Sequence, residues 1–339
     1  MKFIGKHAAV VVFGFCLTPV LQIQLPRSPS ARPTPMSVKK LNTFSVVATD
    51  VPYFSTFGVP LCDGDGNLYF HVDPALNKFT PATIMRLSRD SNTPTTYELS
   101  ADKGKELYFR MFSVTAGGKV WMLESKAGRY EAFGFDSDEK MPDDTHLDVP
   151  EHMEVQDFVV SQTGAMLLGG FFDEHAPKEM QGKAFLALFS PSGQLQRNLT
   201  NEGPEFVKLK EVRNKLHDGA GTTDEYGNFY FTIGSRVIVL TGYGDILREF
   251  SIQKPDDDAT AAALIYGGNL ISIEFVTDHK PPELEMKYLV LDSVSGQPYG
   301  LYAPSDELGN NNVCFSGRSG FTFLRIKDGR VQFLTAPLV

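Results

Sequence analysis

Positive charge is scarce in this sequence. The 339 residues include 32 Lys or Arg against 41 Asp or Glu, which gives a net charge of −9. The pair Lys39-Lys40 is too short to supply a basic patch locally. Because nucleic-acid binding depends on a basic field that neutralises phosphate, a nucleic-acid partner is not expected.

Familiar catalytic motifs are also missing. The chain has no Gly-x-Ser-x-Gly elbow, no His-Glu-x-x-His pair, no phosphate-binding loop and no dinucleotide fingerprint. Phosphoryl transfer and nicotinamide chemistry are therefore disfavoured, and no cofactor is predicted. Whether the chain is an enzyme stays open, and a binding role is favoured.

No apolar run is long enough for a spanning helix. The nearly unbroken apolar stretch at residues 8–21 has the length of a signal-peptide core, and Lys2 and Lys6 precede it. We predict a secretory signal of bacterial type over residues 1–30, with export to the periplasm or beyond. An uncleaved N-terminal anchor is the alternative and would be the only membrane contact.

Between this signal and the folded part we expect a disordered linker at residues 31–41. The preceding residues 27–35 are rich in Pro, Ser and Arg, a composition that buries little apolar surface. A lipid anchor at Cys16 is a further alternative for the N-terminus, although the residue before it, Phe15, is not small.

Few windows show helical periodicity; the best is residues 205–216, for which a single short helix in a loop and an irregular loop are both open. From residue 42 onward, short alternating strands are separated by Gly, Asp, Asn and Ser. The clearest unit is Asp224-Glu225-Tyr226-Gly227-Asn228-Phe229-Tyr230-Phe231. Its turn requires positive φ at the glycine. Equivalent turn glycines are Gly66, Gly118, Gly164, Gly227, Gly268 and Gly320.

Each of these turns is followed by a second hairpin, so the chain contains six units of about four short strands. The turn Asp-x-x-Gly-Asn-φ-Tyr, where φ is apolar, is well formed at residues 63–70 and 224–231. The chain thereby resembles six-bladed β-propellers of the NHL-repeat-like and TolB-like kind. The resemblance implies an all-β fold over residues 42–339: six four-stranded antiparallel blades in a ring, which the N-terminal strand at residues 43–51 would close.

Lactonase-type members of this fold carry a metal-binding Glu early in the first blade, in a Glu-Gly-Pro setting. Here Glu202-Gly203-Pro204 lies in mid-chain, so that role is not transferred. The architecture itself says little about activity.

Cysteine is scarce too, with three in the chain. Without Cys16, only Cys62 and Cys314 remain, and both precede the turn at the end of an inner strand, in blades one and six. A disulfide between them would staple the ring closure. The alternative is two buried free thiols, because inner strands of neighbouring blades can lie too far apart.

A candidate site follows from loop lengths at the ring end opposite the glycine turns. Two long loops carry Asp173 with His175 and Asp278 with His279, and they flank a short connection in blade four. His217 and Asp218 precede that blade and would form the floor of a notch. Imidazole and carboxylate groups suit a ligand-binding groove, a divalent metal or acid–base chemistry; the alternative is solvated loops with local contacts.

Residues 63–67 also resemble the start of a calcium loop but lack the later acidic ligand, so a simple β-turn is favoured. The favoured function is an exported propeller that binds a ligand or protein, or acts as a scaffold. The alternative is a metal-assisted hydrolase or lyase, lactonase-like, with a site at the channel mouth over blade four. A structural envelope component is a third hypothesis.

Overall fold

The computed structural model describes residues 36–52, 56–72, 83–88, 94–98, 108–126, 129–135, 143–201, 221–278, 284–308 and 312–338. The chain divides into two compact units, Met1–Pro35 and Met36–Val339, and all described residues belong to the second. The predicted signal and the predicted helix at residues 205–216 lie outside the described residues. Among the residues described, no helix has the length and apolar character needed to cross a membrane.

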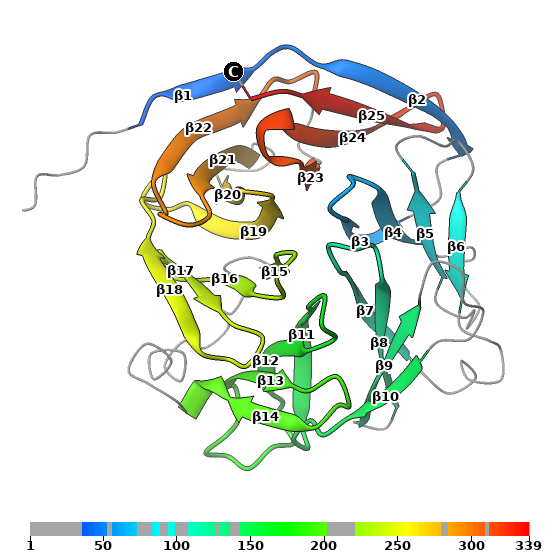
Figure 1. Cartoon of the computed structure of the whole chain (residues 1–339), viewed down its shortest axis with the longest axis vertical. Helices are drawn as coiled ribbons and strands as arrows, with labels where there is room; N and C mark the ends of the chain where they lie inside the picture. The colour runs from blue at the N-terminus through cyan, green and yellow to red at the C-terminus, as the bar shows by residue number, and fades with distance from the viewer. Residues whose placement is uncertain are drawn as a thin grey trace, which may run out of the picture. The chain divides into compact units, whose positions relative to one another are not determined.

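Six small antiparallel sheets, the blades, follow one another around a ring (Figure 1). From the inner strand outward, blades one to three contain β3 (Thr56–Cys62), β4 (Leu68–Val72), β5 (Thr83–Leu87) and β6 (Thr95–Glu98); β7 (Tyr108–Val114), β8 (Val120–Lys126), β9 (Arg129–Phe135) and β10 (Asp143–Leu147); and β11 (Met153–Val160), β12 (Met166–Phe172), β13 (Ala184–Phe189) and β14 (Leu195–Asn198). Blades four to six contain β15 (Thr222–Thr223), β16 (Phe229–Ile233), β17 (Arg236–Leu240) and β18 (Ile246–Ser251); β19 (Thr260–Gly267), β20 (Leu270–Asp278), β21 (Leu284–Asp292) and β22 (Pro298–Pro304); and β23 (Asn312–Phe315), β24 (Phe321–Lys327), β25 (Arg330–Ala336) and β2 (Ser45–Pro52). The predicted all-β, six-bladed propeller is confirmed.

The middle strands of a blade are apolar along their whole length because both blade faces are covered by neighbouring blades. All six residues of β13 are buried, as are the last four of β17. The outer strand β18 is instead mostly exposed and carries polar residues. Strands buried on both faces read as continuous apolar runs rather than as alternating ones.

The hydrophobic core consists of six clusters, one in each seam between neighbouring blades. Between blades three and four, for example, Leu186 and Leu188 pack with Phe229, Phe231 and Ile238. The other five seams have equivalent clusters of apolar residues. Burial of apolar surface therefore holds each blade to its two neighbours around the ring.

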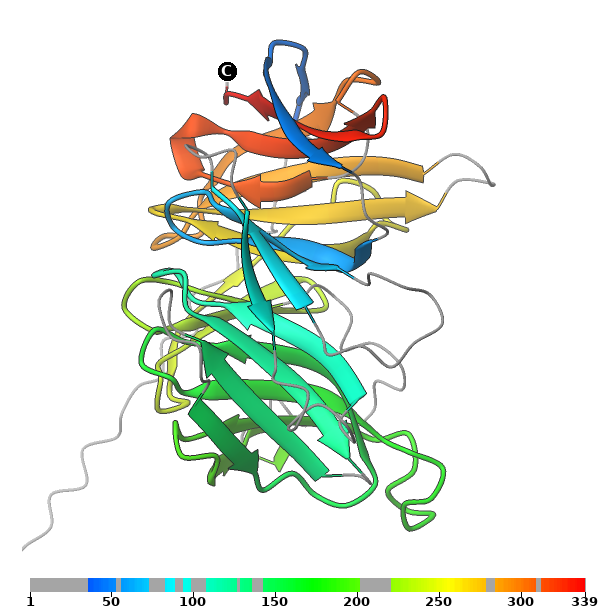
Figure 2. The same ribbon diagram turned by 90° about the vertical axis from the view of Figure 1, so that its right-hand side faces the viewer.

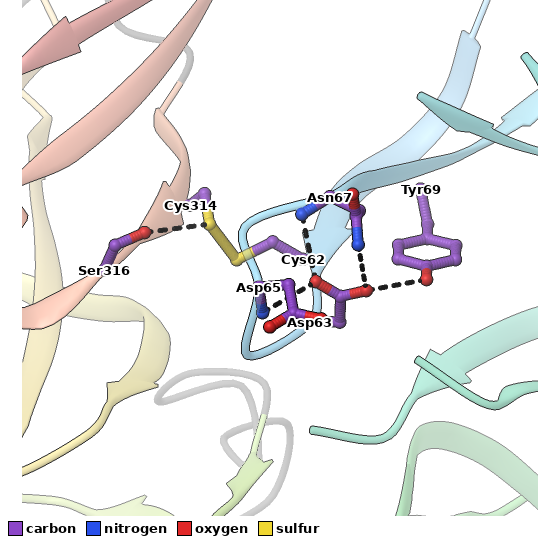
Figure 3. The surroundings of a disulfide bond; sticks show 7 residues. All are labelled: Cys62, Asp63, Asp65, Asn67, Tyr69, Cys314 and Ser316. Carbon is purple, nitrogen blue, oxygen red and sulfur yellow. Dashed lines mark hydrogen bonds between the residues drawn. A yellow bond between two sulfur atoms is a disulfide. The ribbon is translucent and has the colours of Figure 1, made fainter. Parts of the chain in front are cut away.

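The glycine turns have the predicted backbone conformation. Gly66 and Gly227 have φ of 78° and 83°, and the glycines at the four equivalent turns also have positive φ. In blade one, the carboxylate of Asp63 accepts hydrogen bonds from the backbone N–H groups of Asp65 (3.0 Å) and Asn67 (2.9 Å). It also accepts one from Asn67 Nδ2 (2.7 Å) and one from the Tyr69 hydroxyl (2.8 Å) (Figure 3).

Blade four repeats this arrangement around Asp224. Its carboxylate accepts bonds from the Tyr226 and Asn228 N–H groups, from Asn228 Nδ2 (2.8 Å) and from the Tyr230 hydroxyl (3.1 Å). In the repeat motif, the Asp carboxylate thus accepts the hydrogen bonds that the Asn and Tyr side chains donate within one turn. Burial and the neighbouring Asp224 raise the pKa of Tyr230, so the hydroxyl stays protonated and donates.

Two N-terminal strands pair with the last two blades. Strand β2 is the outer strand of blade six and pairs antiparallel with β25, with Ser45 opposite Thr335. Strand β1 (Val38–Leu41) adds a fifth, parallel strand to β22 in blade five. Residues 38–41 were expected in the linker. They form a strand because Leu41 is buried in the seam between blades five and six and Lys39 lies over the Tyr302 ring, at 5.6 Å from its centroid.

A disulfide joins the inner strands of the first and last blades. It links Cys62, at the end of β3, to Cys314 in β23, with the two Cα atoms 5.6 Å apart (Figure 3). The two residues are 252 positions apart in the chain. Blades six and one are thus held together by an apolar cluster and by a covalent bond.

Candidate functional site

The strands run between two ends of the ring, which Figure 2 shows from the side. At one end, the turn end, lie the glycine turns between the first and second strands and the turns between the third and fourth strands. At the other, the loop end, lie the connections between the second and third strands and between blades. The sequence predicted a site at the loop end.

The structure describes only part of that predicted site. Asp173 and His175 lie in the connection between β12 and β13, and Asp278 is the last residue of β20. His279, His217 and Asp218 lie outside the described residues. The short connection expected in blade four is the two-residue turn Gly234-Ser235 between β16 and β17. Of the predicted notch, the structure therefore describes the long β12–β13 loop on one side and the short β16–β17 turn next to it.

Asp173 organises the loop in which it lies. Its Oδ1 accepts hydrogen bonds from the backbone N–H groups of His175 (2.8 Å) and Ala176 (3.1 Å). His175 is exposed, and its Nε2 is 3.9 Å from Glu174 Oε1. The alternative that these residues belong to a solvated loop with local contacts accounts for the observed hydrogen bonds of Asp173.

A histidine that the sequence did not single out lies beside them. His152 precedes β11 and has a φ of 63°, a conformation that non-glycine residues rarely adopt. Its carbonyl accepts the Asp173 N–H at 2.8 Å, and its Nδ1 is 3.8 Å from Asp173 Oδ1. The rings of His152 and His175 are 6.4 Å apart. In the sequence, His152 could have been identified as a site candidate only from its place in the connection that enters blade three at the loop end.

In the described ranges, no three or more His, Cys, Asp or Glu side chains are grouped so that they could hold a metal ion. Two imidazoles and one carboxylate nevertheless lie near one another on blade three. Their separations are longer than direct ligation by one ion requires, so a shared ion would have to move His175 towards His152.

One buried carboxyl has a strongly shifted pKa. Glu124 in β8 is 2% exposed, and it lies on the face of blade two that packs against blade one. Among the described residues, its Oε2 has no hydrogen-bond partner, and Glu131 lies directly opposite on β9. Burial, and next the charge of Glu131, raise the pKa of Glu124 to about 7.

At the turn end, neighbouring glycine turns touch all the way around the ring. We call this closed set of contacts the collar. Glycine recurs in it where two turns approach closely: a Cβ on Gly267 would clash with the backbone of Gly317. The contacts join Gly64 to Ala116, Gly117 to Gln162, Thr163 to Gly227, Tyr230 to Tyr266, Gly267 to Gly317, and Ser316 to Gly66.

Large apolar side chains project from the turn end of the later blades. In the described part of the chain, eleven large apolar side chains are exposed, and seven of them lie at the turn end of blades three to five. The most exposed are Tyr226 (78%), Tyr243 (77%) and Val294 (67%). We call the six members on blades four and five the blade four–five surface: Tyr226, Tyr243, Ile246, Leu247, Val294 and Tyr299. The seventh is Leu195 on blade three.

The turns that carry this surface touch one another. A Cβ on Gly242 would lie 3.5 Å from the Gly227 carbonyl oxygen, so the turns bearing Tyr243 and Tyr226 are in contact. Arg248 Nη1 donates to the Ser293 carbonyl at 3.1 Å and thereby joins β18 of blade four to the turn bearing Val294. The surface therefore spans two blades that the Arg248–Ser293 hydrogen bond joins.

The same positions recur in each blade but differ in residue type. The outer strands of blades three, four and five each have a register shift just after the turn. The residue left over by the shift is Gln196 in blade three, Leu247 in blade four and Tyr299 in blade five. Of these three blades, blade three has a polar residue at this position, whereas blades four and five have Leu and Tyr. The sequence signal was a tyrosine just before the turn glycine, where the other copies carry Asp, Gly, Thr or Ser.

Carboxylates border the surface. Asp292 accepts bonds from the Ser295 N–H and hydroxyl and from the Val294 N–H, which lower its pKa and keep it ionised. The Glu225 side chain bonds the Tyr266 hydroxyl, whose pKa burial and Glu225 raise. Asp245 pairs with Arg197 at 2.7 Å.

Comparisons with known proteins bear on architecture only. No protein-family model matches the chain, and no curated protein does. Among solved structures, it is similar to a calcium-binding protein, regucalcin, from Agrobacterium tumefaciens, with 14% identity, coverage of 89% of this chain and 96% of that chain, and a TM-score of 0.49. It is also similar to a protein described as a gluconolactonase, with 11% identity, coverage of 87% of this chain and 93% of that chain, and a TM-score of 0.47. A third similar structure, described as a TolB from A. tumefaciens, has 13% identity, coverage of 71% of this chain and 78% of that chain, and a TM-score of 0.45. At these identities the likeness concerns the fold, and this fold hosts many functions.

Proposed function

We propose that this chain is an exported protein-binding β-propeller and that the blade four–five surface is its binding site. One observation carries the proposal: the concentration of exposed large apolar side chains at one end of two adjacent blades. Such patches on soluble proteins mark interaction sites, and exposed tyrosines are frequent anchors of protein interfaces.

The scaffold beneath the surface suits a preformed site. The collar and the Asp224 bonds hold the turn bearing Tyr226, and the Arg248 bond holds the turn bearing Val294. Side chains presented by fixed turns lose little conformational freedom on binding, which favours affinity. The Cys62–Cys314 disulfide supports an exported location, since such bonds persist in oxidising compartments.

A photoreactive residue tests the proposal in the source cells. We expect p-benzoylphenylalanine at position 226 or 294 to form a covalent adduct with the same partner protein. Ile326, which is 44% exposed at the loop end, is the matched control position and should give no such adduct. Equal adducts at 226, 294 and 326, or none at 226 and 294, would contradict the proposal.

A second candidate function is metal-assisted hydrolysis or lyase chemistry at the loop end. It is supported by His152, which lies beside Asp173 and His175, the two site candidates that the sequence placed in one loop. If an ion binds there, imidazole nitrogens and one carboxylate oxygen would hold it, a donor set that suits zinc.

Calorimetric titration with Zn²⁺ tests this second candidate. We expect micromolar binding at pH 7.5 that is lost in a His152→Ala variant. The exposed His146→Ala variant is the control and should bind as the unmodified protein does. Zinc binding unchanged by His152→Ala, or no binding, rules out this ion site.

A further inference from the structure

We infer that the blade four–five surface recognises a cationic segment of its partner, in which Lys or Arg side chains alternate with apolar ones. The inference rests on the proposed function and names the chemistry of the partner. Its evidence is the charge around the surface and the aromatic rings within it.

The turns around the surface carry more negative than positive charge. The turn-end segments of blades three to five (residues 188–197, 221–229, 239–248, 266–272 and 290–300) contain four acidic residues and two arginines, a balance of −2 (2 − 4). They contain no lysine. The acidic residues are Asp224, Glu225, Asp245 and Asp292, and the arginines are Arg197 and Arg248.

Both arginines are held by groups of this chain. Arg197 pairs with Asp245 across the seam between blades three and four, and Arg248 donates to the Ser293 carbonyl. Asp224 is 2% exposed and is satisfied within its own turn. Two further carboxylates flank the surface on blades four and five: Glu225, which bonds the Tyr266 hydroxyl, and Asp292, whose pKa is lowered by its turn's hydrogen bonds and to a lesser degree by Arg248.

Exposed tyrosine rings beside carboxylates attract cations in two ways. The ring face binds an ammonium or guanidinium group, and the nearby carboxylate adds a longer-range attraction. Within this chain the first contact already occurs, with Lys119 Nζ 5.1 Å from the Trp121 ring and Lys39 over Tyr302. Tyr226 and Tyr243 present the same kind of ring to solvent, with Glu225 next to Tyr226 in the turn.

The apolar members of the surface decide which cation-bearing ligand fits. Leu247, Ile246 and Val294 offer aliphatic area that a sugar or a small amine would leave uncovered. A peptide segment with both cationic and apolar side chains matches both parts of the surface. Electrostatic attraction would also speed its encounter with a chain of net charge −9.

Three labelled peptides test the inference with the folded protein. They are twelve residues long and repeat Lys-Leu-Ser-Phe, Gln-Leu-Ser-Phe or Glu-Leu-Ser-Phe three times. Fluorescence anisotropy at low salt should show at least ten-fold tighter binding of the lysine peptide than of the glutamate peptide. The lysine peptide's advantage over the glutamine peptide should shrink as salt rises from 50 to 500 mM.

Matched variants separate the two parts of the surface. Tyr226→Ser with Tyr243→Ser should weaken the lysine and glutamine peptides at least ten-fold, whereas Val47→Ser with Ile326→Ser, also exposed apolar residues, should change neither. Glu225→Gln with Asp292→Asn keeps the hydrogen-bond acceptors and removes two charges. It should reduce the lysine preference about five-fold and leave the glutamine peptide unchanged.

The outcomes distinguish this inference from the proposed function. Tyrosine-dependent binding without any preference for lysine overturns the cationic partner and retains the binding surface. Peptide binding that the tyrosine substitutions do not alter overturns both. Tyrosine-dependent binding of a soluble hexasaccharide of glucose or N-acetylglucosamine, with no peptide binding, would assign the surface to carbohydrate and also contradict the inference.

Discussion

At the scale of single residues, the repeat motif has a concrete physical meaning. The buried Asp63 and Asp224 each satisfy two backbone N–H groups, one Asn amide and one Tyr hydroxyl. A buried carboxylate is costly unless its oxygens are bonded, so these residues recur together. Their local spacing is the reason why this part of the structure could be predicted from the sequence.

Glu124 could not be predicted in the same way. It sits in a strand of apolar residues, and its environment depends on which blade covers that face and on Glu131 across the sheet. A sequence shows the carboxyl group, but it does not show that Oε2 lacks a hydrogen-bond partner among the residues that the structure describes. Similarly, His152 becomes notable only when the chain brings it to Asp173.

The raised pKa of Glu124 predicts a pH-dependent stability. The group ionises near pH 4.5 when unfolded and near pH 7 when folded, so its contribution is most favourable below about pH 4.5 and is lost as pH rises through about 7. The full loss is at most about 3 kcal/mol. The stability of a Glu124→Gln variant relative to the unmodified protein should therefore increase as pH rises from 5 to 8.

Urea unfolding at the two pH values measures this gain. Glu131→Gln should give a smaller gain, because it removes only the repulsion, and the exposed Glu154→Gln should give none. A stability difference for Glu124→Gln that is the same at pH 5 and pH 8 would refute the account of this residue.

At the scale of strands and turns, features that depend on neighbouring residues could be predicted from the sequence, and features that depend on distant residues could not. Strands β5 and β17 and the positive φ of the turn glycines follow from short patterns and were confirmed. Strand β1 was not predicted, because its partner β22 is some 260 residues away in the chain and only Leu41 of its four residues is buried. Its sequence alone resembles a linker.

The link between β3 and β23 predicts a large effect of one covalent bond. In the chain-entropy model, a bridge across 252 positions restricts the unfolded chain by about 5 kcal/mol. A Cys62→Ser, Cys314→Ser variant with Cys16 retained should lose 2–5 kcal/mol, as removal of native disulfides typically does. Urea unfolding of the oxidised protein, the reduced protein and the variant measures the loss.

The reduced protein serves as the control for the substitutions themselves. It should unfold at the same urea concentration as the variant, since the pairing of β2 with β25 and the cluster between blades six and one remain in both. An oxidised protein no more stable than the other two would show that the bond contributes nothing.

At the scale of the whole molecule, the ring offers two ends with different surfaces. The loop end holds Asp173 and His175, which the sequence suggested, and the turn end holds exposed tyrosines and aliphatic residues. Loop length directed the sequence prediction to the first. The apolar surface could not be foreseen, because it needs the contact between the turns of blades four and five.

The most direct test of the account compares the two ends in one measurement. The yield of a specific partner adduct is measured, in the source cells, for p-benzoylphenylalanine at position 226 at the turn end and at position 175 at the loop end, both on exposed side chains. A binding site on the blade four–five surface predicts an adduct at 226 and none at 175. An adduct at 175 with none at 226 would contradict it and place the site at the loop end.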